Sequence, residues 1–264
     1  MGTTNTRVIV DGLEAPPGAG WDPAITTYGH FTAMQVRSRR TRGFDLHLAR
    51  LRHATHELFG TELDPGEVRR AIRLALGDDV EDASVRVYVV HAERGPSTIV
   101  TIRPPVDAPA SERVGSVLYQ RPLAHIKHLG GFRIDGLDAQ SYFRRRVQAE
   151  GFDEALLTAV DGTIAEAAIA NIGFVARSTM IWPDAPALAG ITMQLVQAAL
   201  TRLGRPWRRE RVRIDELALF DGAFLTNSHG IWPVTTIDDR TFAIDERWFA
   251  PLSDAYASVA WDEI

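Results

Sequence analysis

Apolar and polar residues alternate along several short stretches of the first hundred residues, a pattern typical of strands with one buried face. The same stretches are rich in valine, isoleucine and threonine, which favour extended backbone. We therefore expect strands at residues 6–10, 30–37, 83–93 and 97–102.

Between the second and third of these strands, the apolar residues take up helical spacing. The stretch "FDLHLARLRHATHELFG", residues 44–60, predicts a helix that ends at Gly60, because glycine readily adopts the left-handed conformation that closes helices. The stretch "LDPGEVRRAIRLALG" predicts a second helix that ends at Gly77. Asp64 would be its N-cap, with Pro65 in the first turn and Glu67 completing a capping box.

The stretch "RPPVDAPASER", residues 103–113, contains three prolines and few apolar residues, which is typical of a linker. The sequence therefore indicates an α+β chain with two domains. We expect a small domain at residues 1–104, a linker at 105–114 and a larger domain at 115–264.

The second half of the chain is richer in strand patterns than the first. Asp161 and Gly162 stand between two apolar runs, a strong signal of a β-hairpin. The spacing of apolar residues also predicts a helix at 191–204 and strands at 208–214, 222–227 and 231–238. It predicts a closing helix at 244–261 that is interrupted at Pro251.

Composition and charge narrow the possible classes of function. The net charge of -5 disfavours a nucleic-acid partner, and the arginine runs Arg144–Arg146 and Arg208–Arg209 are expected to be solvated faces and not binding patches. The chain has no cysteine, so neither disulfides nor a thiolate metal site can form. No apolar stretch approaches the roughly 20 residues of a membrane span, and no signal peptide is recognisable at the start. We expect a cytoplasmic protein that does not bind a membrane.

A metal site is also not expected. His53, His56 and Glu57 would share one face of the first helix. Because the pattern supplies no third ligand from elsewhere in the chain, solvated histidines are the simpler interpretation.

The chain has 29 lysine and arginine residues, and only Lys127, in "LAHIKHLGGF", is a lysine. Arginine keeps its proton in almost any site, whereas a desolvated lysine amine can lose its proton and attack a carbonyl. From this stretch alone, Lys127 is either a surface residue retained by chance or a Schiff-base lysine.

Three more stretches carry candidate chemistry. Glu166 has small or apolar neighbours, so it is either exposed on an outer face or buried with a cationic partner. Ile191 and Thr192 follow Gly190 at a helix start, where backbone N–H groups and a hydroxyl could hold a phosphate, although threonine is also a common N-cap. Asn227 and Ser228 end a strand in a turn that could also offer donors to an anion.

In their order along the chain, these motifs resemble the class IV aminotransferase family, the fold type IV pyridoxal phosphate enzymes. The resemblance covers most of residues 28–238 and rests on five segments: "FDLHLARL", "HIKHLGG", "GFDEALLTAVDGTIAEAAIANIGF", "LAGITM" and "FLTNSHGIWPV". Each motif is degenerate alone, but five in the family's order are specific.

The resemblance implies a small α/β N-terminal domain and a larger, β-barrel-like C-terminal domain with helices. It also implies pyridoxal 5'-phosphate as cofactor and a homodimer. The implied roles are a Schiff base for Lys127, a phosphate clamp for Arg50 and a charge at the pyridine nitrogen for Glu166. The implied phosphate site also includes four residues of the last two motifs: Ile191, Thr192, Asn227 and Ser228.

The sequence departs from the family pattern at several positions. Phe132 stands where many members have a tyrosine near the cofactor's ring hydroxyl, and Met193 replaces a basic residue. Ala167 and Ala168 replace the common Gly-Ala after the glutamate, and "RIDGLDA", residues 133–139, resembles an insert. These changes bear on the substrate class and the rate more than on cofactor binding.

Three functions are compatible with the resemblance. The first is an aminotransferase that takes an amino acid or simple amine as donor and a keto acid as acceptor. The second is a lyase of the aminodeoxychorismate type, because "GHFTAMQV" with Thr32 resembles a strand of those lyases. The third is a non-catalytic member that retains the fold. Tyr28 and Thr32 are candidate substrate-binding residues.

Overall fold

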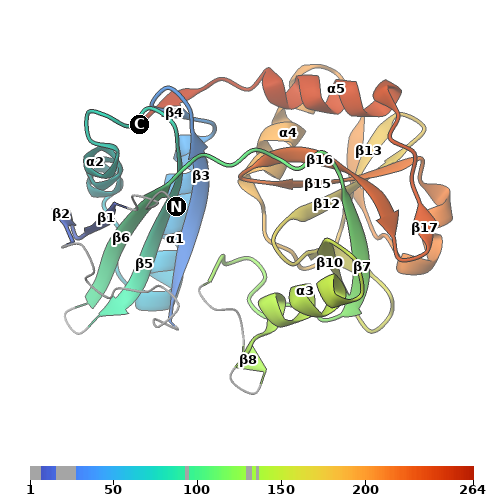
Figure 1. The fold of residues 1–264 in the computed structure, drawn as a ribbon, viewed down its shortest axis with the longest axis horizontal. Coiled ribbons are helices and arrows are strands. Elements are labelled where there is room, and N and C mark those ends of the chain that lie inside the picture. The colour runs from blue at the N-terminus through green and yellow to red at the C-terminus, as the bar shows by residue number, and fades with distance from the viewer. Residues whose placement is uncertain (1–6, 16–27, 93–94, 129–132, 135–136) are drawn as a thin grey trace. The chain divides into compact units, whose positions relative to one another are not determined.

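The computed structural model describes residues 7–15, 28–92, 95–128, 133–134 and 137–264. Phe132 lies outside the described residues, as does part of the 133–139 insert. The chain divides into two compact units (Figure 1). The first comprises Met1–Val106, Ile126–Gly130 and Ala260–Ile264, and the second comprises Asp107–His125 and Gly131–Val259.

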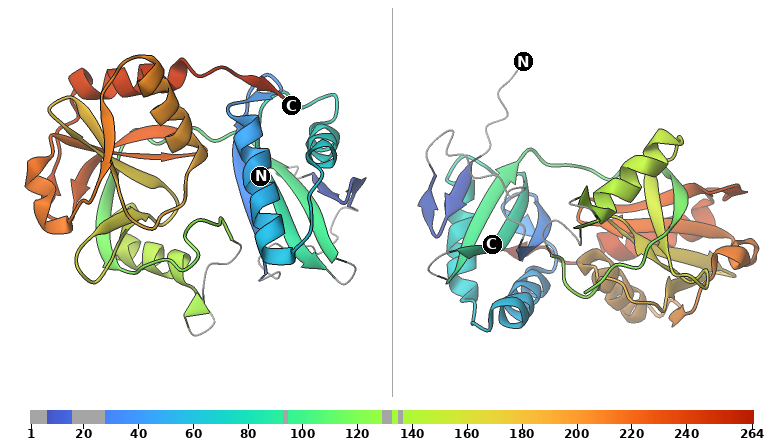
Figure 2. Two further views of the ribbon diagram at one scale, coloured as in Figure 1. Left: turned by 180° about the vertical axis from the view of Figure 1, so that it is seen from behind. Right: turned by 90° about the horizontal axis from the view of Figure 1, so that it is seen from below.

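The first unit contains a five-stranded antiparallel sheet in the order β2-β1-β6-β5-β3. Its strands are β1 (Val8–Val10), β2 (Leu13–Glu14), β3 (Gly29–Val36), β5 (Ala83–Ala92) and β6 (Gly95–Arg103). Helices α1 (Phe44–Phe59) and α2 (Pro65–Leu76) pack on it, and the left view of Figure 2 shows α1 lying along the strands. The predicted strands and helices of this region are confirmed.

The helix ends follow the local sequence. Gly60 ends α1 at φ 65°, in the left-handed region. Asp64 caps α2, but its carboxylate accepts from the amide of Gly66 at 2.7 Å. The predicted capping box through Glu67 is replaced by this contact, and the Glu67 carboxylate lies 3.7 Å from Arg70 instead.

The C-terminal residues of the chain belong to the first unit. β18 (Asp262–Glu263) pairs with β4 (Arg40–Thr41), and the Asp262 carboxylate accepts from the amide of Phe44 at the start of α1. The sequence placed these residues in the larger domain. The proposed folding domains at 1–104 and 115–264 stay a prediction.

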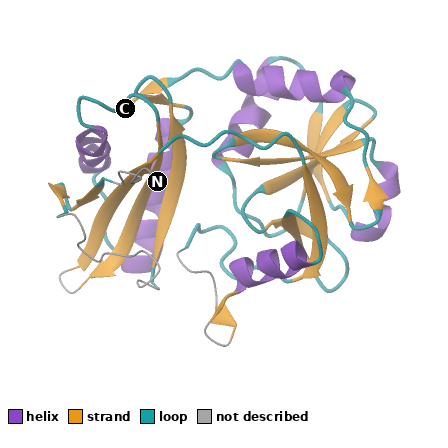
Figure 3. Cartoon of the chain, viewed as in Figure 1, coloured by secondary structure: helices purple, strands orange, loops and turns teal. Residues whose placement is uncertain are grey.

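The second unit is built on a curled nine-stranded sheet, orange in Figure 3, in the order β11-β10-β7-β16-β15-β12-β13-β14, with β17 paired to β16. The strands are β7 (Glu112–Leu118), β10 (Glu154–Thr158), β11 (Ile164–Ala167), β12 (Asn171–Ala176), β13 (Thr179–Pro183), β14 (Trp207–Glu210), β15 (Gly222–Asn227), β16 (Gly230–Ile237) and β17 (Arg240–Thr241). Three neighbouring pairs are parallel: β7 with β10, β7 with β16, and β13 with β14. Apolar side chains from most of these strands fill the inside of the curl.

Helices and short elements complete this unit. The helices are α3 (Ala139–Ala149), α4 (Ile191–Arg202), α5 (Glu246–Ala257) and the 3₁₀ helix η1 (Ile214–Leu219), and a small hairpin joins β8 (Arg133–Ile134) to β9 (Leu137–Asp138). α4 and α5 share one apolar cluster with β12, β13 and β15, while α3 packs on β7 and β10.

The predicted hairpin at Asp161 and Gly162 is confirmed, because β10 and β11 pair antiparallel around it. Three other expectations differ from the structure. α5 continues through Pro251, β7 begins inside the expected linker, and α3 was not anticipated. Among the described residues, no helix is both long and apolar enough to cross a membrane.

Candidate functional site

Glu166 lies on β11, opposite Leu157 of β10, and is 4% exposed. Its Oε1 atom is 3.2 Å from Nε of Arg121, which is 8% exposed. The guanidinium also donates to the carbonyl of Ala124. Of the two interpretations left open by the sequence, burial with a cationic partner is therefore confirmed.

Sequence reasoning missed Arg121. It lies in an irregular stretch far from Glu166 along the chain, and no motif spacing connects them. An arginine beside apolar residues in "RPLAHI" was the only available signal.

The second carboxylate oxygen of Glu166 accepts a hydrogen bond from the segment just before α4. Oε2 accepts from the amide of Leu188 at 3.1 Å, and α4 begins just beyond, with Gly190 as its N-cap. No side chain in the described part of the chain caps this helix. The first amides of a helix lack intrahelical acceptors, so those of Ile191 and Thr192 can bind an anion.

The hydroxyl of Thr192 has a different role from the one expected. It donates to the carbonyl of Asn227 at 2.6 Å, so its proton is not directed at a phosphate. The side-chain amide of Asn227 in turn donates to the carbonyl of Ile169 at 3.3 Å. Ser228 lies in the turn between β15 and β16. Thr192 and Asn227 therefore tie α4 to β15, and the donors that Thr192 can offer an anion are reduced to its backbone amide.

Lys127 belongs to the first unit and is half-buried. Its carbonyl accepts from the amide of Phe31 on β3 at 2.9 Å, and its Nζ atom lies 4.9 Å from the centre of the Phe31 ring. The next residue, His128, forms a β-bridge with His30. These contacts fix the backbone of the lysine segment against β3.

His47 on α1 is the buried centre of this group. Its Nδ1 atom is 2.6 Å from the hydroxyl of Thr32. Burial lowers the pKa of His47 well below its usual value, and the positive charges of Arg50 and Lys127 lower this pKa further. The imidazole is therefore neutral at physiological pH. The first unit thus gathers Thr32, His47, Arg50 and Lys127.

The two candidate substrate residues have separate environments. Thr32 is fully buried against His47. Tyr28 is 51% exposed, and its hydroxyl donates to the carbonyl of Leu58 at 2.9 Å. Their role in substrate binding stays a prediction.

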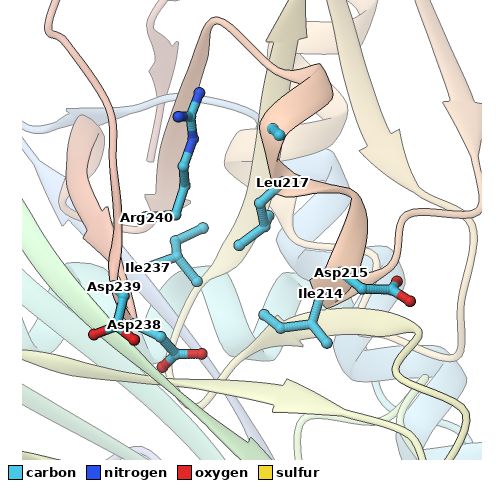
Figure 4. Close-up of a pocket in the computed structure, with 8 residues that line it drawn as sticks. Ile214, Asp215, Leu217, Ile237, Asp238, Asp239 and Arg240 are labelled. Atoms are coloured by element: carbon cyan, nitrogen blue, oxygen red, sulfur yellow. The ribbon is translucent and has the colours of Figure 1, made fainter.

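An open pocket of about 300 Å³ lies between η1 and the β16–β17 turn (Figure 4). Its apolar wall includes Ile214, Leu217 and Ile237, while Asp215 and Asp238 lie toward its edge. Asp238 accepts from the amide of Ser116 at 2.7 Å, so its carboxylate stabilises the fold. None of the predicted site residues lines this pocket.

The family model described as "Amino-transferase class IV" matches residues 29–237, which is most of the chain. The chain belongs to the class IV aminotransferase family. This match spans Arg50, Lys127, Glu166 and the start of α4. The roles of these residues stay predictions.

Curated relatives of this class IV family member match over a shorter stretch. A "Probable branched-chain-amino-acid aminotransferase" of Rickettsia felis is 35% identical over 86 residues, which is 32% of this chain and 30% of the relative. The protein of the same description from Rickettsia conorii is 33% identical over the same share. The match thus spans less than a third of the curated relatives' length.

Solved structures of several aminotransferases are similar over nearly the whole chain. A fold IV transaminase from Curtobacterium pusillum has a TM-score of 0.79 at 20% identity, covering 97% of this chain and 100% of that one. A branched-chain aminotransferase from Thermoproteus uzoniensis, solved with norvaline, has a TM-score of 0.81 at 19% identity, covering 95% and 93%. A hypothetical aminotransferase from Mycobacterium tuberculosis, in its PLP-bound form, has a TM-score of 0.79 at 19% identity, covering 96% and 99%. The chain therefore has the fold type IV architecture.

Proposed function

We propose that this protein is a pyridoxal phosphate-dependent aminotransferase that moves an amino group from an amino acid or small amine to a keto acid. The observation that carries the proposal is in the second unit. A buried carboxylate, Glu166, is joined through a single residue, Leu188, to the uncapped start of α4. Family membership supplies the chemical context for this pair of features.

The groups present fit the cofactor. Pyridoxal phosphate carries a basic ring nitrogen and a phosphate dianion, and it supplies an electron sink when bound. Glu166 lies 3.2 Å from the Arg121 guanidinium, and its carboxylate would hold a proton at the ring nitrogen. The amides of Ile191 and Thr192 would bind phosphate oxygens.

Lys127 and Arg50 would supply the remaining groups. Lys127 would hold the cofactor covalently through Nζ and later move a proton with the same atom. Arg50 would bind the phosphate through charge-assisted hydrogen bonds. The neutral imidazole of His47, on which the charges of both cations act, adds no further positive charge near them.

Borohydride reduction of the purified, cofactor-loaded protein tests the proposal. Peptide mass mapping should then locate the cofactor on the peptide that contains Lys127, the only lysine of the chain. Lys127→Arg keeps the charge but cannot form the linkage, so no reduced adduct should be found on this peptide. A parent protein that binds no cofactor after reconstitution would contradict the proposal.

The amino donor is identified by the change in visible absorbance on adding candidate donors. A panel should include branched-chain L-amino acids, other L-amino acids, D-alanine and simple amines. Conversion to the amine form of the cofactor indicates a transaminase. No conversion by any donor, with the cofactor bound, would favour the lyase that the strand of Thr32 suggested.

We further propose a homodimer that acts in the cytoplasm, as the sequence resemblance implied. Light scattering coupled to size-exclusion chromatography would give a mass near twice 29.2 kDa for the dimer. A mass of one chain would contradict it.

A further inference from the structure

Asn171, the first residue of β12, is buried beside the turn that leads into α4. Its Nδ2 atom donates to the carbonyl of Leu188 at 2.7 Å. Its side-chain oxygen lies against Gly190, where an added β-carbon would be 1.8 Å from Oδ1. Gly190 has φ -58°, which any residue can adopt. The close approach of Asn171, and not the backbone conformation, therefore requires glycine at this position.

The peptide groups of Leu188 are held at both ends of the residue. Its N–H donates to Oε2 of Glu166 at 3.1 Å, and its carbonyl accepts from Asn171 and from the amide of Gly190 at 2.8 Å. A displacement of Leu188 would therefore change both the direction of the Glu166 carboxylate and the position of the first turn of α4.

A second set of hydrogen bonds reaches the same region from β15. Thr192 donates to the carbonyl of Asn227, and the Asn227 side chain donates to the carbonyl of Ile169. Ile169 lies two positions before Asn171, in the connection between β11 and β12. This short connection therefore supports the start of α4 from two directions.

We propose that Asn171 is a positioning residue for cofactor binding. Acting through Leu188 and Gly190, it holds the Glu166 carboxylate and the first amides of α4 in one fixed geometry. The inference rests on the proposed function, and Asn171 itself is assigned no contact with the cofactor. Groups that are aligned before binding need no ordering when the ligand arrives, so loss of this alignment weakens affinity.

Four variants test the role of Asn171. Asn171→Ala removes both contacts, Asn171→Asp replaces the N–H donor with a carboxylate oxygen that opposes the carbonyl of Leu188, and Gly190→Ala places a methyl group against Oδ1. Each should weaken the dissociation constant for pyridoxal phosphate by about tenfold or more, because a buried carbonyl or a packed turn is disturbed. In the double variant Asn171→Ala/Gly190→Ala, the new methyl group enters the space left by the asparagine. The double variant should therefore lose no more affinity for pyridoxal phosphate than Asn171→Ala alone. If the two substitutions acted independently, their losses would add.

Gln194→Ala is the matched control. Gln194 also donates a side-chain N–H to this turn, at the neighbouring carbonyl of Ala189, but from a more exposed position. Its loss should leave the affinity for pyridoxal phosphate within about twofold of the parent.

A second measurement separates positioning from simple loss of stability. The pH midpoint of the bound cofactor's visible absorbance should shift in the Asn171 variants, because a reoriented Glu166 changes the charge at the ring, and it should not shift in Gln194→Ala. If Asn171→Ala does not fold, the affinity and the pH midpoint are measured with Asn171→Asp and Gly190→Ala.

The two proposals fail in distinguishable ways. A parent protein that binds no pyridoxal phosphate overturns the proposed function and this inference together. A parent that binds it, with Asn171→Asp or Gly190→Ala matching the parent in affinity and in pH midpoint, overturns the positioning role alone.

Discussion

Glu166 and Arg121 form an ion pair inside the second unit, with 3.2 Å between Oε1 and Nε. Both side chains are almost fully removed from solvent, at 5% and 6% exposure. Each charge is therefore tolerated chiefly because the other is present. The pair lies at the end of the network through which Glu166 reaches α4.

Arg121→Met should lower the free energy of unfolding by about 3–5 kcal/mol, because it leaves the Glu166 carboxylate buried without its cation. The double variant Arg121→Met/Glu166→Gln should regain much of this loss, since no isolated charge remains. Urea denaturation of the cofactor-free proteins measures both values. Equal stability of Arg121→Met and the parent would show that Glu166 does not depend on this partner.

Glu166→Gln keeps the size of the side chain but removes its charge. Under the proposed function, cofactor should still bind, while the half-reaction with an amino donor should slow by more than about tenfold, equivalent to 1.36 kcal/mol. The loss arises because a neutral amide no longer holds a proton at the ring nitrogen. Stopped-flow absorbance measures the rate. A rate within about twofold of the parent would remove Glu166 from the site.

Arg50→Ala should weaken cofactor affinity by at least about tenfold, because a charge-assisted contact of roughly 1.5–3 kcal/mol would be lost. Arg52→Ala is the control, since Arg52 lies on the same helix, is 55% exposed in its side chain, and pairs only loosely with Glu62 at 3.9 Å. Equilibrium titration of both variants gives the dissociation constants. Equal affinities would make Arg50 an ordinary residue of the helix surface.

Glu154 should make stability depend on pH. It is buried on β10 with Arg144 of α3 at 2.8 Å, and Glu112 of β7 adds a second negative charge nearby. Burial raises the pKa of Glu154 from 4.5 to about 7 despite Arg144 and the amide of Ala155, which lower it. Because the folded chain then binds this proton more tightly than the unfolded chain, stability should fall as pH rises from about 4.5 to about 7.

The variant Glu154→Gln isolates this effect. The buried histidines His30 and His47 have lowered pKa values, so each should give the opposite slope below about pH 6.5, and the slope from His30 should extend down to about pH 4. Both histidines are present in both proteins. The free energy of unfolding of Glu154→Gln, measured relative to that of the parent, should therefore increase by about 3 kcal/mol as the pH rises from about 4.5 to about 7. Urea denaturation across this range gives the difference. A difference that does not change with pH would show that Glu154 does not titrate there.

Much of the local structure could be predicted from the sequence. The spacing of apolar residues predicted the positions of most helices and strands. Gly60 and Asp64 marked helix ends, and Asp161 with Gly162 marked a hairpin. These signals succeed because they depend on backbone conformation and on neighbours within a few residues.

Packing overrode a local signal at Pro251. Proline removes one helical hydrogen bond and costs about 3 kcal/mol inside a helix, so the sequence predicted an interruption. α5 continues because Trp248, Leu252 and Ala255 are buried in the cluster that also contains residues of α4. The apolar contacts on both sides of the proline outweigh the lost bond.

Only the tertiary structure decided which distant residues meet. Glu166 was a candidate from the sequence, but its partner Arg121 was not, and Arg144 was expected in solvent although it binds buried Glu154. The hydroxyl of Thr192 was expected to face an anion and instead donates to Asn227. Each of these contacts joins elements brought together by the curled sheet of the second unit. Local propensity does not predict such contacts, because they depend on how helices, strands and irregular segments pack against one another and not on the conformation of each segment alone.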